Sequence, residues 1–223
     1  MEYLSRKEEA SASGKLGEFY KQEMLENLRY NSGTNCWETS IDGRTIIIGR
    51  KNIDNDFDPS SNKNTNYTLE QSREHVHLSL SNMQDKTIEG FAKFARQYYE
   101  NINLNTYGDF VITSLWRTST ADAPHNLGRS IDMVYANGTP VYAAESGNVT
   151  FAGMGTSLNG YGGYGNIVVI QGDDGMKYYY AHNTSVSVQA NANVTSGSLI
   201  SYSGNSGGSI LHPYAYHLHF EVR

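Results

Sequence analysis

The chain has 223 residues, which suits one large domain or one domain with a sizeable extension, and its 38% hydrophobic residues can build a full core. The formal net charge is −6 and no basic run is present, which argues against nucleic acid as a partner. The longest apolar runs have only strand length, so we expect no membrane insertion. Residues 1–30 lack the apolar stretch of a secretory signal peptide.

Cysteine and histidine limit the possible metal chemistry. Cys36 is the single cysteine, so an internal disulfide and a cysteine-based zinc site are both excluded. Five of the seven histidines fall in the C-terminal half, where lysine and arginine are scarce: His125, His182, His212, His217 and His219. The histidines are therefore the more informative group.

The composition changes near residue 105. Residues 1–105 carry 13 Lys and Arg and 16 Asp and Glu, against 4 and 7 in residues 106–223, while the glycine count rises from 6 to 16. We interpret residues 1–105 as an N-terminal extension of unknown function and residues 106–223 as a separate domain.

Two stretches of residues 1–105 have the periodicity of amphipathic helices. Apolar side chains from Leu16 to Leu28 share one stripe, with Ser11 or Ser13 as the expected cap. A stronger stripe runs from Ile88 to Ile102, with Asp85 as its expected cap. The aromatic face of this second helix is too apolar for water, so we expect it to pack on the C-terminal domain.

Between these helices the sequence predicts a hairpin and a loop. Asp42-Gly43 separates Trp37–Ile41 from Arg44–Gly49, a pattern typical of a type I′ turn. The polar stretch 51–70 predicts a loop. As an alternative, its Asn-rich part 51–68 lies over a groove of the C-terminal domain and regulates access to it. Read as a strand, His75-Val-His77 would place both imidazoles on one face, with no carboxylate partner evident.

Residues 106–223 are typical of a β-rich domain. Short β-branched and aromatic runs alternate with turn signals such as Asn137-Gly138 and Asp174-Gly175. The expected strands are Phe110–Ser114, Asn148–Ala152, Asn166–Gln171, Met176–Ala181, Ser185–Gln189, Ser198–Ser203 and His217–Val222. The predicted class is α+β, with a mainly antiparallel, barrel-like or sandwich-like β domain after a mixed helical extension.

Two histidines near the C-terminus have the spacing of neighbours on one sheet face. Alternation along His217–Val222 points His217 and His219 the same way, and Leu218 and Phe220 toward a core. Such a pair suits a metal site, although two surface histidines on an edge strand would look the same.

A second histidine and a carboxylate offer further ligands. His125 and Asp132 flank a glycine turn, and Asp132 lies between Ile131 and Met133 at an expected strand start. His125, Asp132 and one histidine of the C-terminal pair would give zinc three ligands, with a fourth position open for water, as in catalytic sites. A loop histidine and a capping aspartate are the alternative. His182 ends the run Tyr178–His182, where a site rim is expected.

Together these pieces resemble the lysostaphin-type (LytM-like) zinc endopeptidases that cut peptidoglycan cross-bridges. The resemblance covers the C-terminal half only and implies a compact antiparallel β fold with a groove over one zinc ion. The matching motifs follow in the family's order: Gly138–Gly147, Gly165–Ile170, Tyr180–His182, Val194–Ile200, Ser203–Gly207 and His217–Val222.

One spacing departs from the family. The usual separation of the first histidine ligand and the aspartate is His-x3-Asp, whereas here it is His-x6-Asp. The longer form is similar to the D-Ala-D-Ala carboxypeptidase and L-Ala-D-Glu peptidase group. That group ends its site with a Glu-x-x-His type element, and this chain has His217-x-His219 instead.

The resemblance implies a role for each of five residues. His125, Asp132 and His219 become the zinc ligands, and His182 and His217 the catalytic pair. We expect His217 to act as general base and His182, if protonated, to stabilise the oxyanion, although the sequence also allows the reverse. No His-Glu-x-x-His motif is present, so a glutamate base of that type is excluded.

The predicted function is a zinc endopeptidase acting on peptidoglycan peptides outside the cytoplasm, as a phage lysin, a virion-associated hydrolase or a secreted enzyme. A wall carboxypeptidase or L-Ala-D-Glu peptidase is the alternative within enzymes. An inactive wall-binding scaffold on the same fold is the alternative from another class, and retention of all five site residues argues against it.

Overall fold

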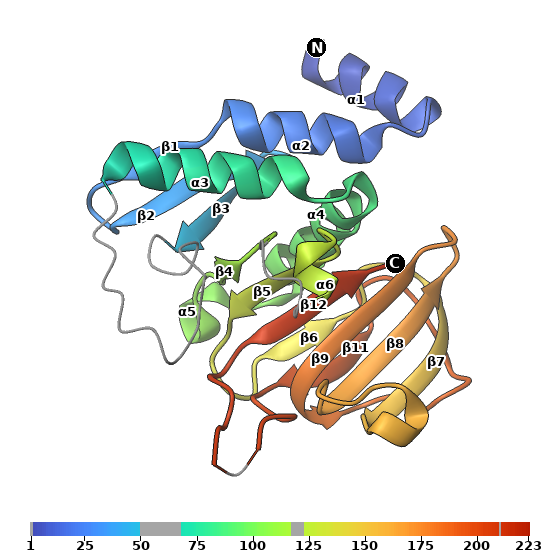
Figure 1. Ribbon diagram of the computed structural model, residues 1–223. Coiled ribbons are helices and arrows are strands. Elements are labelled where there is room, and N and C mark those ends of the chain that lie inside the picture. The colour runs from blue at the N-terminus through green and yellow to red at the C-terminus, as the bar shows by residue number, and fades with distance from the viewer. Residues whose placement is uncertain (1, 50–67, 117–122, 210) are drawn as a thin grey trace. The chain divides into compact units, whose positions relative to one another are not determined.

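The computed structural model describes residues 2–49, 68–116, 123–209 and 211–223, and Figure 1 shows their helices and strands. The chain divides into two compact units, one made of residues 1–89 and 111–131, the other of residues 90–110 and 132–223. Every helix in the described ranges is too short or too polar to cross a bilayer.

The first unit combines helices with a small sheet. Its elements are α1 (Glu2–Ala12), α2 (Leu16–Glu26), β1 (Arg29–Asn31), β2 (Cys36–Ile41), β3 (Arg44–Gly49), α3 (Leu69–Asn82), the start of α4 (Asp85–Asn101), β4 (Val111–Ser114), α6 (Ala123–Asn126) and the start of β5 (Ser130–Val134). Strands β1 to β4 are neighbours in chain order. The β1–β2 and β2–β3 pairs are antiparallel, whereas β3 and β4 are parallel.

The predicted hairpin is confirmed. Ile41 pairs with Arg44, and Asp42 and Gly43 have φ of 52° and 71°, the left-handed conformations that a type I′ turn requires. The helix from Leu16 is also confirmed, but its cap is not. The N-cap position is Lys15, Ser11 lies within α1, and the Ser13 hydroxyl donates to carbonyls of α1.

Other predictions for this unit need correction or fall outside the described residues. Most of the stretch 51–70 lies outside them, and Thr68 caps α3, so Leu69 and Glu70 are helical rather than loop. His75 and His77 lie inside α3, where a spacing of two residues does not share a face. Asp85 is the first residue of α4 and pairs with Lys21 at 2.5 Å, instead of capping the helix.

The second unit is a mainly antiparallel sheet with helix α4 packed on it. Its elements are the rest of α4, α5 (Leu104–Tyr107), the rest of β5, β6 (Pro140–Tyr142), β7 (Gly147–Met154), the 3-10 turn Ser157–Asn159, β8 (Asn166–Gly172), β9 (Lys177–Val186), β10 (Asn193–Val194), β11 (Leu199–Ser203) and β12 (Leu218–Val222). The strand order is β5-β12-β9-β8-β7-β10, with β11 paired to β9 and β6. Within the described residues this order does not close into a barrel, and the predicted α+β class is confirmed.

Most predicted strands of the second unit are present, with shifted ends. The run Ser185–Gln189 is the exception, because its first two residues extend β9 and the rest leave the sheet. Strands β6 and β10 were not predicted, since each is only two or three residues long.

An aromatic cluster joins α4 to the sheet, as predicted for this helix. The ring of Phe94 lies 5.0 Å from that of Phe220 on β12, and Phe110 and Tyr135 complete the cluster. At Gly90 the helix approaches so closely that a β-carbon would lie 2.8 Å from Val222. Glycine, which has no β-carbon, allows this approach, so the backbone of α4 packs directly against the Val222 side chain of β12.

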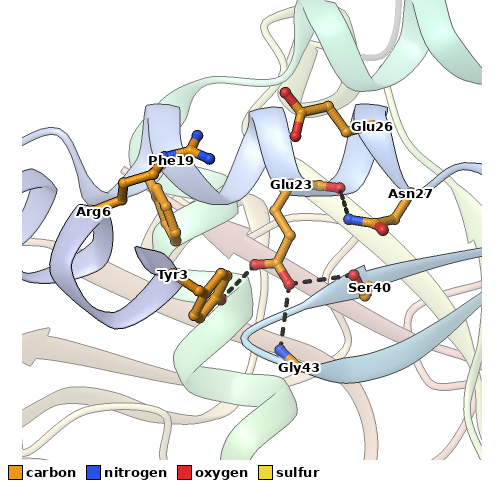
Figure 2. Close-up of a pocket in the computed structure, with 8 residues that line it drawn as sticks. All are labelled: Tyr3, Arg6, Phe19, Glu23, Glu26, Asn27, Ser40 and Gly43. Carbon is orange, nitrogen blue, oxygen red and sulfur yellow. Dashed lines mark hydrogen bonds between the residues drawn. The ribbon is translucent and has the colours of Figure 1, made fainter. Parts of the chain in front are cut away.

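A buried carboxylate organises the first unit. Glu23 of α2 accepts hydrogen bonds from the Tyr3 hydroxyl at 2.8 Å, the Ser40 hydroxyl at 3.2 Å and the Gly43 amide at 3.3 Å, as Figure 2 shows. The Asp42 amide donates to it as well, at 3.0 Å. Glu23 lines a pocket of about 340 Å³ whose other lining side chains include Arg6 and Phe19. Because four donors already occupy this carboxylate, its role is to join α1, α2 and the hairpin turn.

The Glu23→Ala substitution should lower the free energy of unfolding by about 1–3 kcal/mol, because it removes the buried, charged acceptor of four hydrogen bonds. Urea unfolding monitored by circular dichroism measures this change. Glu26→Ala, on the exposed side of the same helix, is the matched control and should stay close to wild type. Equal stability of the two variants would show that the Glu23 contacts contribute nothing.

A second anchor of α4 depends on charge. Lys93 contacts Asp174 at 2.6 Å and Glu145 at 2.9 Å. Burial alone would raise the pKa of Asp174, but hydrogen bonds from Lys93, Tyr178 and the Met176 amide outweigh burial and lower it. A carboxyl group with a lowered pKa stabilises the fold above its unfolded-state pKa, and this contribution is lost as the pH falls through the folded-state pKa.

We therefore expect Asp174→Asn to lower the melting temperature near pH 7 and to have progressively less effect as the pH falls below 4. Asp173→Asn, at the neighbouring exposed position, is the control. A melting-temperature difference between wild type and Asp174→Asn that does not change from pH 7 to pH 3 would contradict this account.

Candidate metal centre

Strand β12 carries the central histidine of the site. Its neighbour β9 pairs with it antiparallel, with His219 opposite Ala181 and Phe220 opposite Tyr180. Figure 1 labels both strands. The alternate residues Leu218, Phe220 and Val222 are fully buried in the core. Core packing of these side chains therefore determines the direction in which His219 points.

His219 meets a buried carboxylate. Its Nδ1 lies 2.8 Å from Oδ1 of Asp132, which stands on β5, the strand next to β12. Both residues are buried, with only 9% of the His219 side chain and 12% of the Asp132 side chain exposed. Burial alone would lower the pKa of His219, but Asp132 and Glu221 outweigh burial and raise it to about 9. The contact thus places two atoms that can bind a metal, Nδ1 of His219 and Oδ1 of Asp132, next to each other in a buried site.

Two further histidines lie side by side next to this contact. The ring centroids of His182 and His217 are 4.6 Å apart, and those of His182 and His219 are 5.7 Å apart. Nδ1 of His182 lies 2.8 Å from the Ser206 carbonyl oxygen, and Nδ1 of His217 lies 2.7 Å from that of Ala215. A carbonyl oxygen only accepts, so Nδ1 carries the proton in each ring and Nε2 presents a lone pair.

A β-bulge brings His182 into position. The register between β8 and β9 shifts between the pairs Val168–Tyr180 and Asn166–Asn183, so β9 holds one extra residue there. His182 has φ of 63°, a left-handed conformation that is uncommon for a residue other than glycine, and its amide donates to the Tyr164 carbonyl at 2.9 Å. Bulges beside functional sites redirect side chains, and this one explains why simple alternation along β9 does not locate His182.

Burial keeps His182 neutral. Desolvation, together with the neighbouring rings of His219 and His217, lowers the pKa of His182 to about 3. The imidazolium form that an oxyanion-stabilising role would require is therefore disfavoured at this position.

His125, in the first unit, also has its Nδ1 next to a backbone carbonyl oxygen. It lies on α6 and is buried, and its Nδ1 is 2.8 Å from the Leu115 carbonyl oxygen. The proton of its neutral form is therefore on Nδ1, and Nε2 is the atom able to bind a metal. Six residues of chain separate His125 from Asp132.

Two groups near His219 were not predicted as part of the site. Glu221 lies two residues further along β12, and its Oε2 is 3.7 Å from Nε2 of His219. Burial would raise the pKa of Glu221, but contacts with His219 and Arg223 lower it to about 2. The period of two that pairs His217 with His219 also includes Glu221, so this signal was present in the sequence.

The second unpredicted group is Tyr214, in the loop before β12. Its ring centroid lies 4.7 Å from that of His182, and Asn205 holds its carbonyl oxygen at 3.2 Å. His212 in the same loop is exposed.

The donor set fits zinc. Asp132 and His219 of the second unit offer one carboxylate and one imidazole, and His125 of the first unit offers another imidazole; all three residues are buried, and zinc readily accepts such nitrogen and oxygen donors. Ligand atoms on a tetrahedral zinc lie about 3.4 Å apart at zinc–ligand distances near 2.1 Å. The 2.8 Å separation of Asp132 Oδ1 and His219 Nδ1 needs only a small opening to reach that value.

Comparison with known proteins finds a matching peptidase family and several relatives for the C-terminal half of the chain. Residues 126–223 match peptidase family M23. The chain is 39% identical over 97 residues to DD-carboxypeptidase/endopeptidase Mpg of Neisseria gonorrhoeae, covering 44% of this chain and 20% of that protein. It is 34% identical over 92 residues to lipoprotein NlpD of Yersinia enterocolitica, covering 41% of this chain and 84% of that protein.

A solved structure with a similar segment is the catalytic domain of the antimicrobial peptidase lysostaphin from Staphylococcus simulans. The two are 30% identical, with a TM-score of 0.39, and the match covers 53% of this chain and 81% of that domain. The chain spans about a fifth of the length of the Neisseria protein.

Proposed function

Because the chain belongs to peptidase family M23 through residues 126–223, we propose that it is a zinc-dependent endopeptidase that hydrolyses peptide bonds in bacterial peptidoglycan. The observation that carries the proposal is the buried contact of Asp132 with His219, next to two histidines whose Nε2 atoms present lone pairs. Residues 106–223 are the proposed peptidase domain, with α4 packed on its sheet.

The proposed ligands are Nε2 of His125, Oδ1 of Asp132 and Nδ1 of His219, for one zinc ion per chain. The Leu115 carbonyl holds His125 in the tautomer that this role needs. A zinc ion bound there supplies Lewis acidity, which polarises a peptide carbonyl and lowers the pKa of a water molecule toward about 7. Three protein ligands leave a fourth position open, as catalytic sites require.

His182 and His217 are the proposed catalytic pair. Each has its Nδ1 proton directed to a backbone carbonyl, so each accepts a proton or hydrogen bond at Nε2. We assign proton abstraction from the attacking water, and delivery to the leaving amine, to His217, the more exposed of the two. His182 accepts a hydrogen bond from the same water and orients it. The oxyanion-stabilising role expected from the sequence would need the charged form of His182, and burial lowers the pKa of this residue.

A carboxypeptidase is the second candidate, favoured by the printed name of the Neisseria relative and by the His-x6-Asp spacing. A carboxypeptidase requires a free terminal carboxylate on its substrate, whereas an endopeptidase does not. Digestion of muropeptides with free and amidated C-termini, followed by mass spectrometry, separates the two functions. Cleavage of the amidated peptides supports the endopeptidase, and cleavage restricted to free carboxylates supports the alternative.

The proposed place of action is the cell wall, outside the cytoplasm. The substrate is found there, and one relative is named a lipoprotein. A phage lysin, a virion-associated hydrolase and a secreted enzyme all satisfy this proposal.

The metal site generates the first functional prediction. His125→Ala, Asp132→Ala and His219→Ala should each lose stoichiometric zinc, because a site with three protein ligands does not hold zinc tightly with two. Plasma emission spectroscopy of the purified protein measures the zinc content, and His217→Ala should retain it. If His219→Ala kept one zinc ion per chain and His217→Ala lost it, His217 would be the zinc ligand and His219 would not. Wild-type protein without zinc would favour the scaffold reading.

The second functional prediction concerns the proposed catalytic pair, His182 and His217. His182→Ala and His217→Ala should keep the fold and the zinc but lower the rate of muropeptide cleavage by about 10²- to 10⁴-fold, the usual contribution of a general acid or base. His212→Ala, in the loop preceding β12, is the control and should cleave at the wild-type rate. If either variant cleaves muropeptides at the wild-type rate, the substituted histidine takes no part in the chemistry.

A further inference from the structure

Strand β12 carries a second polar side chain on the face that holds His219. Glu221 is fully buried (0% exposed), which is unusual for a carboxylate without a compensating network. Its Oε2 lies 3.7 Å from Nε2 of His219, the ring nitrogen opposite the one that contacts Asp132. His219 is therefore placed between two carboxylates, one on each side of its ring.

Glu221 is itself held by two donors. The Tyr164 hydroxyl donates to its Oε2 at 2.8 Å, and Nε of Arg223 donates to its Oε1 at 2.6 Å. Arg223 also donates to the Tyr164 hydroxyl at 3.1 Å, and its guanidinium lies 4.6 Å from the ring centroid of Tyr179. These contacts fix the carboxylate in one orientation and compensate for its burial.

The two sides of the His219 ring have different chemistry when a metal is bound. A neutral imidazole carries one N–H, so a ring that binds zinc through Nδ1 has its proton on Nε2. Imidazole ligands in metal sites commonly donate that second N–H to a carboxylate, which fixes the tautomer and makes the ligand more basic. In this chain the carboxylate that faces Nε2 is Glu221.

We propose that Glu221 is a positioning residue for the metal ligand His219, holding its proton on Nε2 so that Nδ1 binds zinc, with Tyr164 and Arg223 orienting Glu221. This inference rests on the proposed function, because it takes His219 as a zinc ligand. The alternative role for Glu221 is a purely structural ion pair with Arg223.

The test measures zinc affinity by competition with a chromophoric chelator in the full chain. Glu221→Gln keeps the side-chain shape and removes the charge, and should weaken zinc binding by about 10- to 100-fold. Glu145→Gln is the control, since Glu145 is another ion-pair carboxylate of the same unit, and the zinc affinity of this variant should equal that of wild type.

Arg223→Gln separates the two roles of Glu221. It removes the ion pair but leaves the carboxylate opposite His219, so its zinc affinity should stay much closer to wild type than that of Glu221→Gln. If Glu221→Gln does not fold, Glu221→Asp, which retains the charge but withdraws it from the ring, should weaken zinc binding relative to wild type. The visible absorption spectrum of the Co²⁺-substituted proteins gives a second readout, which should change in the Glu221 variants and not in Glu145→Gln.

The outcomes distinguish failure of this inference from failure of the proposed function. Wild-type zinc affinity in the folded Glu221 variants would overturn the positioning role while leaving the zinc site intact. A wild-type protein that binds no zinc would overturn the proposed function, and this inference with it.

Discussion

The buried contact between Asp132 and His219 is the interaction on which the proposed site depends. Two neighbouring strands carry its partners, and core packing of the alternate residues on β12 determines the direction of the histidine. Without a cation the contact is a hydrogen bond at 2.8 Å, and with one it supplies two ligand atoms that are already close together. The sheet thus holds the donor atoms close together before a metal binds, which reduces the reorganisation that binding requires.

The remaining histidines depend on backbone geometry more than on side-chain packing. Backbone carbonyls of Leu115, Ser206 and Ala215 receive the Nδ1 protons of His125, His182 and His217. The same hydrogen bond from Nδ1 to a backbone carbonyl thereby serves two proposed purposes. It leaves Nε2 of His125 available to bind a metal, and it leaves Nε2 of His182 and His217 available to accept a proton or a hydrogen bond. His219, whose Nδ1 faces a carboxylate, is the exception.

Sequence periodicity predicted the parts of this arrangement that follow from regular strands and turns. Alternation placed His219 opposite the core residues of β12, and Asp42-Gly43 predicted the hairpin. Periodicity did not predict the orientation of His182, because a bulge and the left-handed backbone conformation of His182 itself interrupt the alternation on β9. Helices α1 and α3 were missed because their apolar stripes are weak, and α1 buries no residue.

Zinc K-edge X-ray absorption of the purified full-length protein tests the central claim most directly, because it reports the ligand atoms themselves. The account predicts a light-atom shell of four nitrogen and oxygen donors, with the outer-shell scattering of two imidazole rings, and the loss of one ring's contribution in any zinc retained by His219→Ala. A spectrum with three or more imidazoles, or one unchanged in His219→Ala, would contradict it.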